Sequence, residues 1–188
     1  MRTLLALLVA LSVTVTVGVW ANEEDANITR QRLADNIQTL QPRVPMERAL
    51  DLAAHFAEAG EDHYFDPKLL IAVSYRETNF DPDFETLQRF GKSRGEIGLM
   101  QCHGACLRFR PAKCSEVLEG AWCQIQTGTR YLAYLRSKCP GPRRRWLTTY
   151  ATGRCLPLQS RKMHYSVWRA YLYYKKIGGE RWVLKKSR

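Results

Sequence analysis

The segment from residue 66 to residue 101 constrains the fold most, because it joins a well-marked helix to a glycine-rich turn. Asp66 can accept hydrogen bonds from the first free amides of a helix, and Pro67 suits the first helical position, where no N–H is needed. Pro82 disfavours helical geometry in the residue before it. We therefore expect a helix that starts at Pro67 and ends near Asp81.

A glutamate lies on the apolar side of this expected helix. Leu70, Val73 and Glu77 are spaced i, i+3 and i+7, so they share one stripe. Partial burial and a place in the last turn both disfavour an ionised carboxylate. We expect these effects to raise the pKa of Glu77, as a general acid requires. In the alternative interpretation, Glu77 lies at the helix edge and pairs with a cation such as Arg76 or Arg94.

A glycine-punctuated turn follows, in which residues 95–101 read GEIGLMQ. The two glycines permit positive φ or a close approach of the backbone. The apolar pair followed by Gln indicates an apolar surface that carries a single amide group. A helix that ends in Glu, then a loop, then G-x-x-G-L-M-Q resembles the catalytic domain of soluble lytic transglycosylases. These lysozyme-like enzymes cut the glycan strands of peptidoglycan. The resemblance covers roughly Met46 to Ile177 and implies an all-α, lysozyme-like helical domain.

The resemblance also implies a set of site residues. Glu77 matches the family's single catalytic acid/base, and residues 98–101 match the motif that lines the sugar groove. The third family motif, Tyr-Asn-Ala-Gly, reads YATG at residues 150–153, so Ala151 stands in place of the motif Asn. For Tyr150 and Tyr165, packing in the hydrophobic core is the alternative role. The implied substrate-binding residues are Thr78, Ser93, Gly98, Leu99, Met100, Gln101, Tyr150 and Tyr165.

A single glutamate implies non-hydrolytic cleavage of the MurNAc–GlcNAc β-1,4 bond, in which the MurNAc 6-hydroxyl closes on C1 as a 1,6-anhydro ring. This reaction needs no cofactor and no second carboxylate. A hydrolytic muramidase would use a further acid to position water, with Asp81, Asp83, Glu85 and Glu96 as candidates. The sequence is also compatible with a catalytically weak module that binds glycan or a secretion-apparatus partner, and with a cationic membrane-active protein.

The first residues read as an export signal. A positive start precedes an apolar run from Leu4 to Val19, and small residues lead to a cleavage point after Ala21. The alternative is an uncleaved membrane anchor. We therefore expect a periplasmic or secreted protein. The expected organisation is a signal at 1–21, a polar segment at 22–44 forming a short helix or a tether, the catalytic domain at 45–178 and a basic tail at 179–188.

Six cysteines lie in the second half of the chain. An even number in an exported protein indicates disulfides formed in an oxidising compartment, although the sequence does not choose the pairing. A zinc site is the alternative, but the spacing of its ligands is irregular and no C-x-x-C pair is present. The zinc ligands in that alternative are Cys102, His103, Cys106 and Cys114.

The formal net charge of +11 is concentrated late in the chain, at residues 143–145, 161–162, 175–176 and 185–188. Such a field attracts polyanions, or it serves only as a solubilising surface. No nucleic-acid-binding motif accompanies the charge. We therefore expect partners among peptidoglycan strands, anionic envelope polymers and envelope or secretion machinery, and not nucleic acid.

Apolar residues at helical spacing predict the remaining elements, and no segment alternates as a strand would. The segment from Met46 to Ala59 is rich in helix formers, and Gly60 is expected to cap it. Leu99 is expected to begin another helix, interrupted by Gly104. Residues 81–94 read as irregular, with Phe84, Leu87 and Phe90 turned inward. Further helices are expected over Trp122–Leu135, Arg144–Ala151 and Ser160–Ile177.

Overall fold

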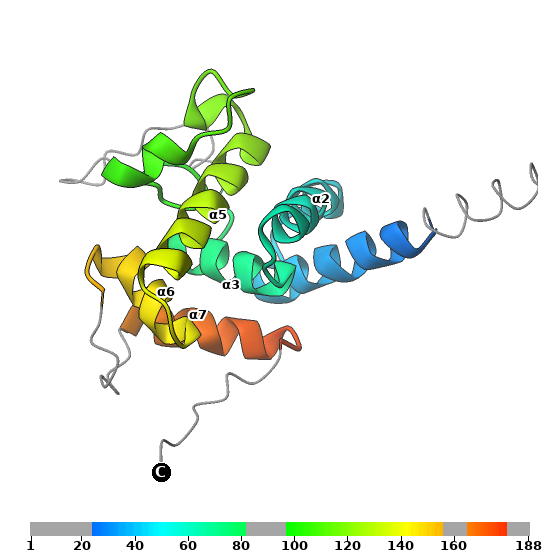
Figure 1. Cartoon of the computed structure of the whole chain (residues 1–188). Helices are drawn as coiled ribbons and strands as arrows, with labels where there is room; N and C mark the ends of the chain where they lie inside the picture. Colours follow the sequence, from blue (N-terminus) through cyan, green and yellow to red (C-terminus); the bar gives the residue numbers. More distant parts are fainter. Residues whose placement is uncertain (1–23, 82–96, 156–164, 180–188) are drawn as a thin grey trace, which may run out of the picture.

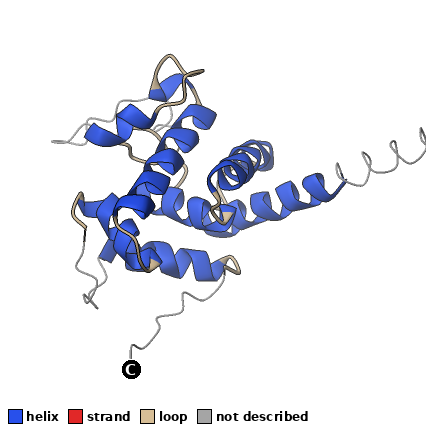
Figure 2. Cartoon of the chain, viewed as in Figure 1, coloured by secondary structure: helices blue, strands red, loops and turns tan. Residues whose placement is uncertain are grey.

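The computed structural model describes residues 24–81, 97–155 and 165–179, and every regular element in these ranges is a helix (Figure 2). An isolated bridge joins Ile97 to Cys102. Within the same ranges, no helix combines the length and the apolarity needed to cross a bilayer. The prediction of an all-α fold is confirmed for these described residues. The elements are a helix over 24–40, α2 (Met46–His63), α3 (Pro67–Thr78), the 3₁₀ helices η1 (Gly104–Phe109) and η2 (Val117–Glu119), α5 (Ala121–Lys138), α6 (Arg143–Thr152) and α7 (Tyr165–Lys176).

Several predictions fall outside the described residues. These are the signal expected at 1–21, the inward orientation expected for Phe84, Leu87 and Phe90, the groove role expected for Ser93 and the tail from residue 180 onward.

Helix α3 occupies the middle of the fold. It packs against α2 and α7, while α5 packs against α2, α6 and both 3₁₀ helices. In Figure 1, α7 lies along the lower edge of the molecule, below α3, and α6 overlaps its left part. One continuous core fills the space between these helices. Its largest fully buried members include Ile37, Leu52, Phe56, Leu69, Leu70, Ile71, Leu99, Met100, Ile125, Leu132 and Tyr174.

The segment expected as a short helix or tether is a helix over 24–40, and it belongs to this core. Leu33, Ala34, Ile37 and Leu40 are all buried in it. Their spacing places them on one stripe of the helix, which docks against the rest of the molecule.

Helix α2 does not end at Gly60, so that prediction is wrong. It continues to His63, and Tyr64 terminates it in the left-handed conformation with φ 55°. Gly60 is buried inside the helix, where a Cβ would lie 2.8 Å from the Phe65 carbonyl oxygen and 2.9 Å from Cγ of Pro67. The glycine therefore permits close packing of the α2–α3 connection and does not cap the helix.

Helix α3 begins as predicted and ends earlier than predicted. The Asp66 carboxylate accepts a hydrogen bond from the Lys68 amide at 2.9 Å, and Pro67 holds the first position. The helix stops at Thr78, three residues before Asp81, because Asn79 and Phe80 adopt left-handed φ values of 54° and 56°. The turn buries the Phe80 side chain, so tertiary packing sets this boundary.

Candidate active site

Glu77 lies in the last turn of α3 with 18% of its side chain exposed. Its Oε2 accepts a hydrogen bond from Nη1 of Arg76 at 3.1 Å. The other arm of the same guanidinium, Nη2, donates to the Ser166 hydroxyl on α7. Glu77 is thus largely buried, as expected, and is also in contact with Arg76, as the alternative interpretation held. Arg76 links the carboxylate to α7.

A small hollow beside Glu77 is walled by α3, α6 and α7. Its volume is about 10 Å³, close to the space that one water molecule needs. The hollow is lined by Val73, Arg76, Glu77, Leu147, Tyr150, Ala151, Ser166, Val167 and Ala170.

A larger pocket of about 250 Å³ shares two of these residues, Tyr150 and Ala151. Its volume is near the lower limit of about 300 Å³ for ligand pockets in proteins. Tyr150 and Ala151 therefore stand between the carboxylate and a cavity that could hold part of a ligand. The pocket is lined by Gln101, His103, Cys106, Tyr131, Tyr150, Ala151, Thr152 and Gly153.

The motif Gly98–Gln101 forms a tight turn, so the helix predicted to begin at Leu99 is absent. The Gln101 amide donates to the Gly98 carbonyl at 2.9 Å, and Ile97 pairs with Cys102 across the turn. Gly98 and Gln101 have φ values of 72° and 47°, which a right-handed helix cannot include. The next helical residues belong to η1.

Helix α3 holds this turn through the Leu99 carbonyl. The Ser74 hydroxyl donates to that oxygen at 3.1 Å, and the Thr78 hydroxyl lies 3.4 Å from it. Thr78 is buried and lines neither cavity. Its hydroxyl therefore positions the turn and does not face a ligand, which differs from the role expected for it.

Helices α5 and α6 hold the turn from the other sides. The Leu99 amide donates to Oε1 of Gln124 at 2.8 Å, and the Tyr150 hydroxyl donates to the Met100 carbonyl. The side chains of Leu99 and Met100 have no exposed surface and line neither cavity. Of the four motif residues, Gln101 is the one that reaches the larger pocket, and its Nε2 donates to the Gly98 carbonyl at 2.9 Å.

Gln124 belongs to this arrangement, although no prediction from the sequence included it. A Cβ on Gly98 would lie 2.9 Å from the Gln124 side chain, and a Cβ on Gly128 would lie 2.5 Å from that of Met100. The two glycines thus let the turn lie directly on α5. Gln124 and Gly128 are spaced i and i+4, so they share one helix face. A glutamine one helical turn before a glycine was the signal in the sequence that could have identified Gln124.

The tyrosines expected in the groove differ in position. Tyr150 lines both cavities, and its ring lies 5.7 Å from that of Tyr131. Burial, with a smaller contribution from neighbouring Tyr134, raises the pKa of Tyr131, which stays a neutral phenol at physiological pH. Tyr165 is 67% exposed at the start of α7 and lines neither cavity. The structure therefore does not bring Tyr165 together with Glu77.

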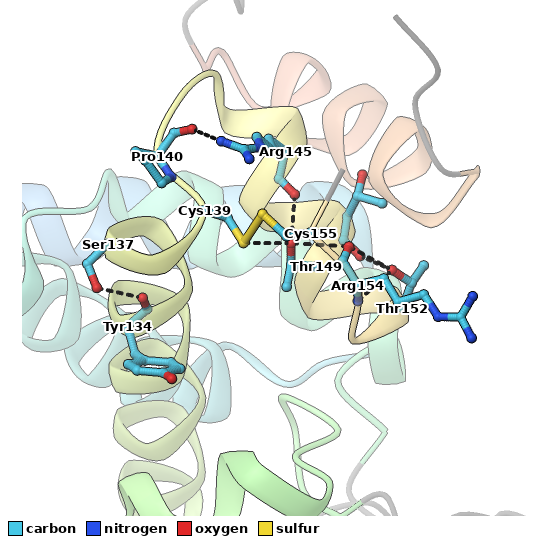
Figure 3. The surroundings of a disulfide bond; sticks show 10 residues. Tyr134, Ser137, Cys139, Pro140, Arg145, Thr149, Thr152, Arg154 and Cys155 are labelled. Atoms are coloured by element: carbon cyan, nitrogen blue, oxygen red, sulfur yellow. Dashed lines mark hydrogen bonds between the residues drawn. A yellow bond between two sulfur atoms is a disulfide. The ribbon is translucent and has the colours of Figure 1, made fainter. Parts of the chain in front are cut away.

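The helix that carries Tyr150 and Ala151 is fastened at both ends by a disulfide. Cys139 precedes α6, Cys155 follows it, and the two sulfurs are joined (Figure 3). The Thr149 hydroxyl lies 3.1 Å from the Arg145 carbonyl and 3.4 Å from the Cys139 sulfur, inside this loop. The disulfide thereby fixes the wall that separates the two cavities.

The cysteines are paired, as predicted, through Cys102–Cys106, Cys114–Cys123 and Cys139–Cys155. The pairing removes Cys102, Cys106 and Cys114 as thiolate ligands for the alternative zinc site. Among the residues that the structure describes, Cys114, Glu119 and Cys123 lie close enough to share an ion. Their two sulfurs are already bonded to each other, so this group does not offer the thiolates that zinc prefers.

Comparison of the chain with protein-family models, curated proteins and solved structures gives no match in any of the three.

Proposed function

We propose that this chain is an exported peptidoglycan lytic transglycosylase with a lysozyme-like fold, and that Glu77 is its single acid/base. The observation that carries the proposal is the bonding around the turn at 98–101. Helix α3, which presents Glu77, and helix α6, which presents Tyr150, both hydrogen-bond to its carbonyls. Tyr150 also lines the hollow at Glu77 and the larger pocket reached by Gln101. The Glu77 carboxylate thus lines the hollow, the Gln101 amide lines the larger pocket, and the Tyr150 phenol lines both.

In the proposed reaction, protonated Glu77 donates its proton to the oxygen that links MurNAc C1 to GlcNAc. The C1–O bond breaks as positive charge develops at C1, and GlcNAc leaves with the proton. The Glu77 carboxylate then takes the proton of the MurNAc 6-hydroxyl while that oxygen bonds to C1. The carboxyl group is thereby returned to its starting form. Because the nucleophile belongs to the substrate, the reaction requires no second carboxylate at the distances found in glycoside hydrolases.

Arg76 sets a requirement for this mechanism. A neighbouring guanidinium favours the charged form of a carboxylate, whereas the first step needs the protonated form. We propose that sugar bound over the hollow excludes water from Glu77, while Arg76 stays held by Ser166, its second partner. Desolvation of the carboxylate then opposes the ion pair and favours proton uptake.

The deciding experiment is mass spectrometry of the fragments released from purified sacculi. Fragments ending in 1,6-anhydro-MurNAc are expected from the wild type, and Glu77→Gln should lower their rate of release by about 10²- to 10⁴-fold. Glu47→Gln, an exposed carboxylate in the first turn of α2, is the matched control and should keep the wild-type rate. Equal release by the wild type and Glu77→Gln, with both folded by circular dichroism, would exclude catalysis by Glu77.

Reducing-end fragments would instead identify a hydrolytic muramidase. Of the four acids expected to position water in that alternative, Asp81 lies in the described part of the chain. It lines a different pocket, of about 490 Å³, together with Arg43 and Phe80. The position of Asp81 therefore gives the hydrolytic reaction no support at the hollow beside Glu77.

Two observations favour a second candidate, a catalytically weak module that binds glycan or envelope machinery. Ala151, which replaces the family's motif Asn, is exposed and lines both cavities, and Arg76 contacts Glu77. An Asn side chain at position 151 would project into the cavities, so Ala151→Asn should raise the release rate of an active transglycosylase. Retention of the wild type on sacculi, with no release by either protein, would favour the binding module.

A further inference from the structure

Helix α7 turns an apolar and cationic face away from the core. Ser166, Ala170 and Tyr174 are buried against α3 and α6 on its inner side. The opposite side, here called the outer face of α7, is exposed. The outer face consists of Tyr165, Trp168, Arg169, Leu172, Lys175 and Lys176, all of them exposed.

The apolar residues of the outer face form a stripe. Tyr165, Trp168 and Leu172 are 67%, 44% and 45% exposed, and their i, i+3, i+7 spacing aligns them along one side of the helix. They are three of the eight large exposed hydrophobic residues in the described part of the chain. Scattered exposed residues are normal on a soluble protein, but an aligned group on one helix indicates an interaction surface.

The charges on α7 have a single sign. The helix carries Arg169, Lys175 and Lys176 and has no acidic residue. The Arg169 guanidinium lies 5.7 Å from the ring centre of Tyr165, which places a cation beside the apolar stripe. Lys68 adds a further cation at the far end of α7, where its Nζ donates to the Gly178 carbonyl at 3.1 Å. The outer face therefore complements an anionic partner.

We propose that the outer face of α7 docks on the surface of an anionic lipid bilayer. Trp168, Leu172 and the Tyr165 ring would enter the boundary between headgroups and acyl chains, while the cations contact lipid phosphates. A soluble polyanion accounts for the cations but offers nothing to the Leu172 and Trp168 side chains. A bilayer surface accounts for both. With 12 residues, α7 is about 18 Å long and would lie in the plane of the surface.

Docking in this way is independent of the proposed catalysis. The residues of α7 that line the hollow beside Glu77 are Ser166, Val167 and Ala170, and none of them belongs to the outer face. A protein with no transglycosylase activity could therefore still dock. A transglycosylase that did not dock would still release anhydro fragments.

The test is sedimentation with lipid vesicles. The full chain is expressed in a bacterium, and the protein that the cells export is purified for the assay. The wild type should bind vesicles of phosphatidylglycerol and phosphatidylcholine in equal parts, and bind vesicles of phosphatidylcholine alone far more weakly. Trp168→Ser with Leu172→Ser should weaken binding to the anionic vesicles more than tenfold. Arg169→Gln with Lys176→Gln should weaken it roughly thirtyfold at low salt.

Matched variants on other elements control for loss of apolar groups or charge in general. Ile28→Ser with Leu107→Ser removes two exposed apolar side chains outside α7, and Arg32→Gln with Arg130→Gln removes two exposed charges. Both controls should bind like the wild type. The proposal is overturned by absent binding, by equal binding to neutral vesicles, by unchanged binding of the α7 variants, or by equal losses in the controls.

Discussion

Two buried threonines, Thr78 and Thr129, should respond in opposite directions when each is replaced by valine. Thr78 is 3% exposed, and its hydroxyl lies 3.1 Å from the Ser74 carbonyl and 3.4 Å from the Leu99 carbonyl. Thr129 has no exposed surface, and its hydroxyl has no hydrogen-bond partner in the described structure. Both substitutions keep a β-branched side chain within a helix, so the fate of the hydroxyl decides the change in stability.

The magnitudes follow from these surroundings. Thr78→Val removes one net hydrogen bond, and the Leu99 carbonyl keeps its bond from Ser74, so the free energy of unfolding should fall by about 1 kcal/mol. Thr129→Val removes a buried hydroxyl whose loss of hydration nothing offsets, so the free energy of unfolding should rise by about 1 kcal/mol. For a chain of this size, each change corresponds to a shift in Tm of about 2 to 4 °C, downward and upward respectively.

The assay is reversible urea unfolding followed by far-UV circular dichroism, with the disulfides intact and the dependence on urea the same for all variants. Thr78→Ser is the control, because it keeps the hydroxyl at the turn. A Thr129→Val protein destabilised as much as Thr78→Val would refute the reasoning, since it would mean that the Thr129 hydroxyl is bonded in solution.

Three further outcomes are expected. Gly128→Ala should destabilise the fold by about 1 to 3 kcal/mol in the same assay, because the new methyl group would overlap the Met100 side chain. Replacing Cys139 and Cys155 by Ser should lower the free energy of unfolding by about 3 kcal/mol in the same assay, since the bond closes a loop with a sequence separation of 16. Burial lowers the pKa of His55 below its usual 6.5, so the unfolded chain binds a proton at this residue more readily than the folded protein does. The free energy of unfolding should therefore decline as pH falls below 6.5, and His55→Gln should reduce that decline, measured as the urea midpoint at each pH.

Local signals were sufficient for the start of α3 and for the helical class. The Asp66 cap and Pro67 act within one turn of the chain, and apolar residues at helical spacing identify the segments that become α2, α5, α6 and α7. The even number of cysteines was enough to predict disulfides. These features depend on residues close together in sequence, or on composition, and the sequence alone determined them.

Tertiary structure decided what depends on distant partners. Gly60 has the sequence signal of a helix cap, yet α2 runs past it because α3 packs against its backbone. Leu99 begins an apolar pair that suggests the start of a helix. Its hydrogen bonds with Ser74 and Gln124 hold it in a turn instead. The family resemblance implied that Tyr165 lies with the groove residues, but the packing of α7 leaves it exposed. A side chain's role at this site depends on which helix lies opposite it, and neither spacing nor propensity along one segment contains that information.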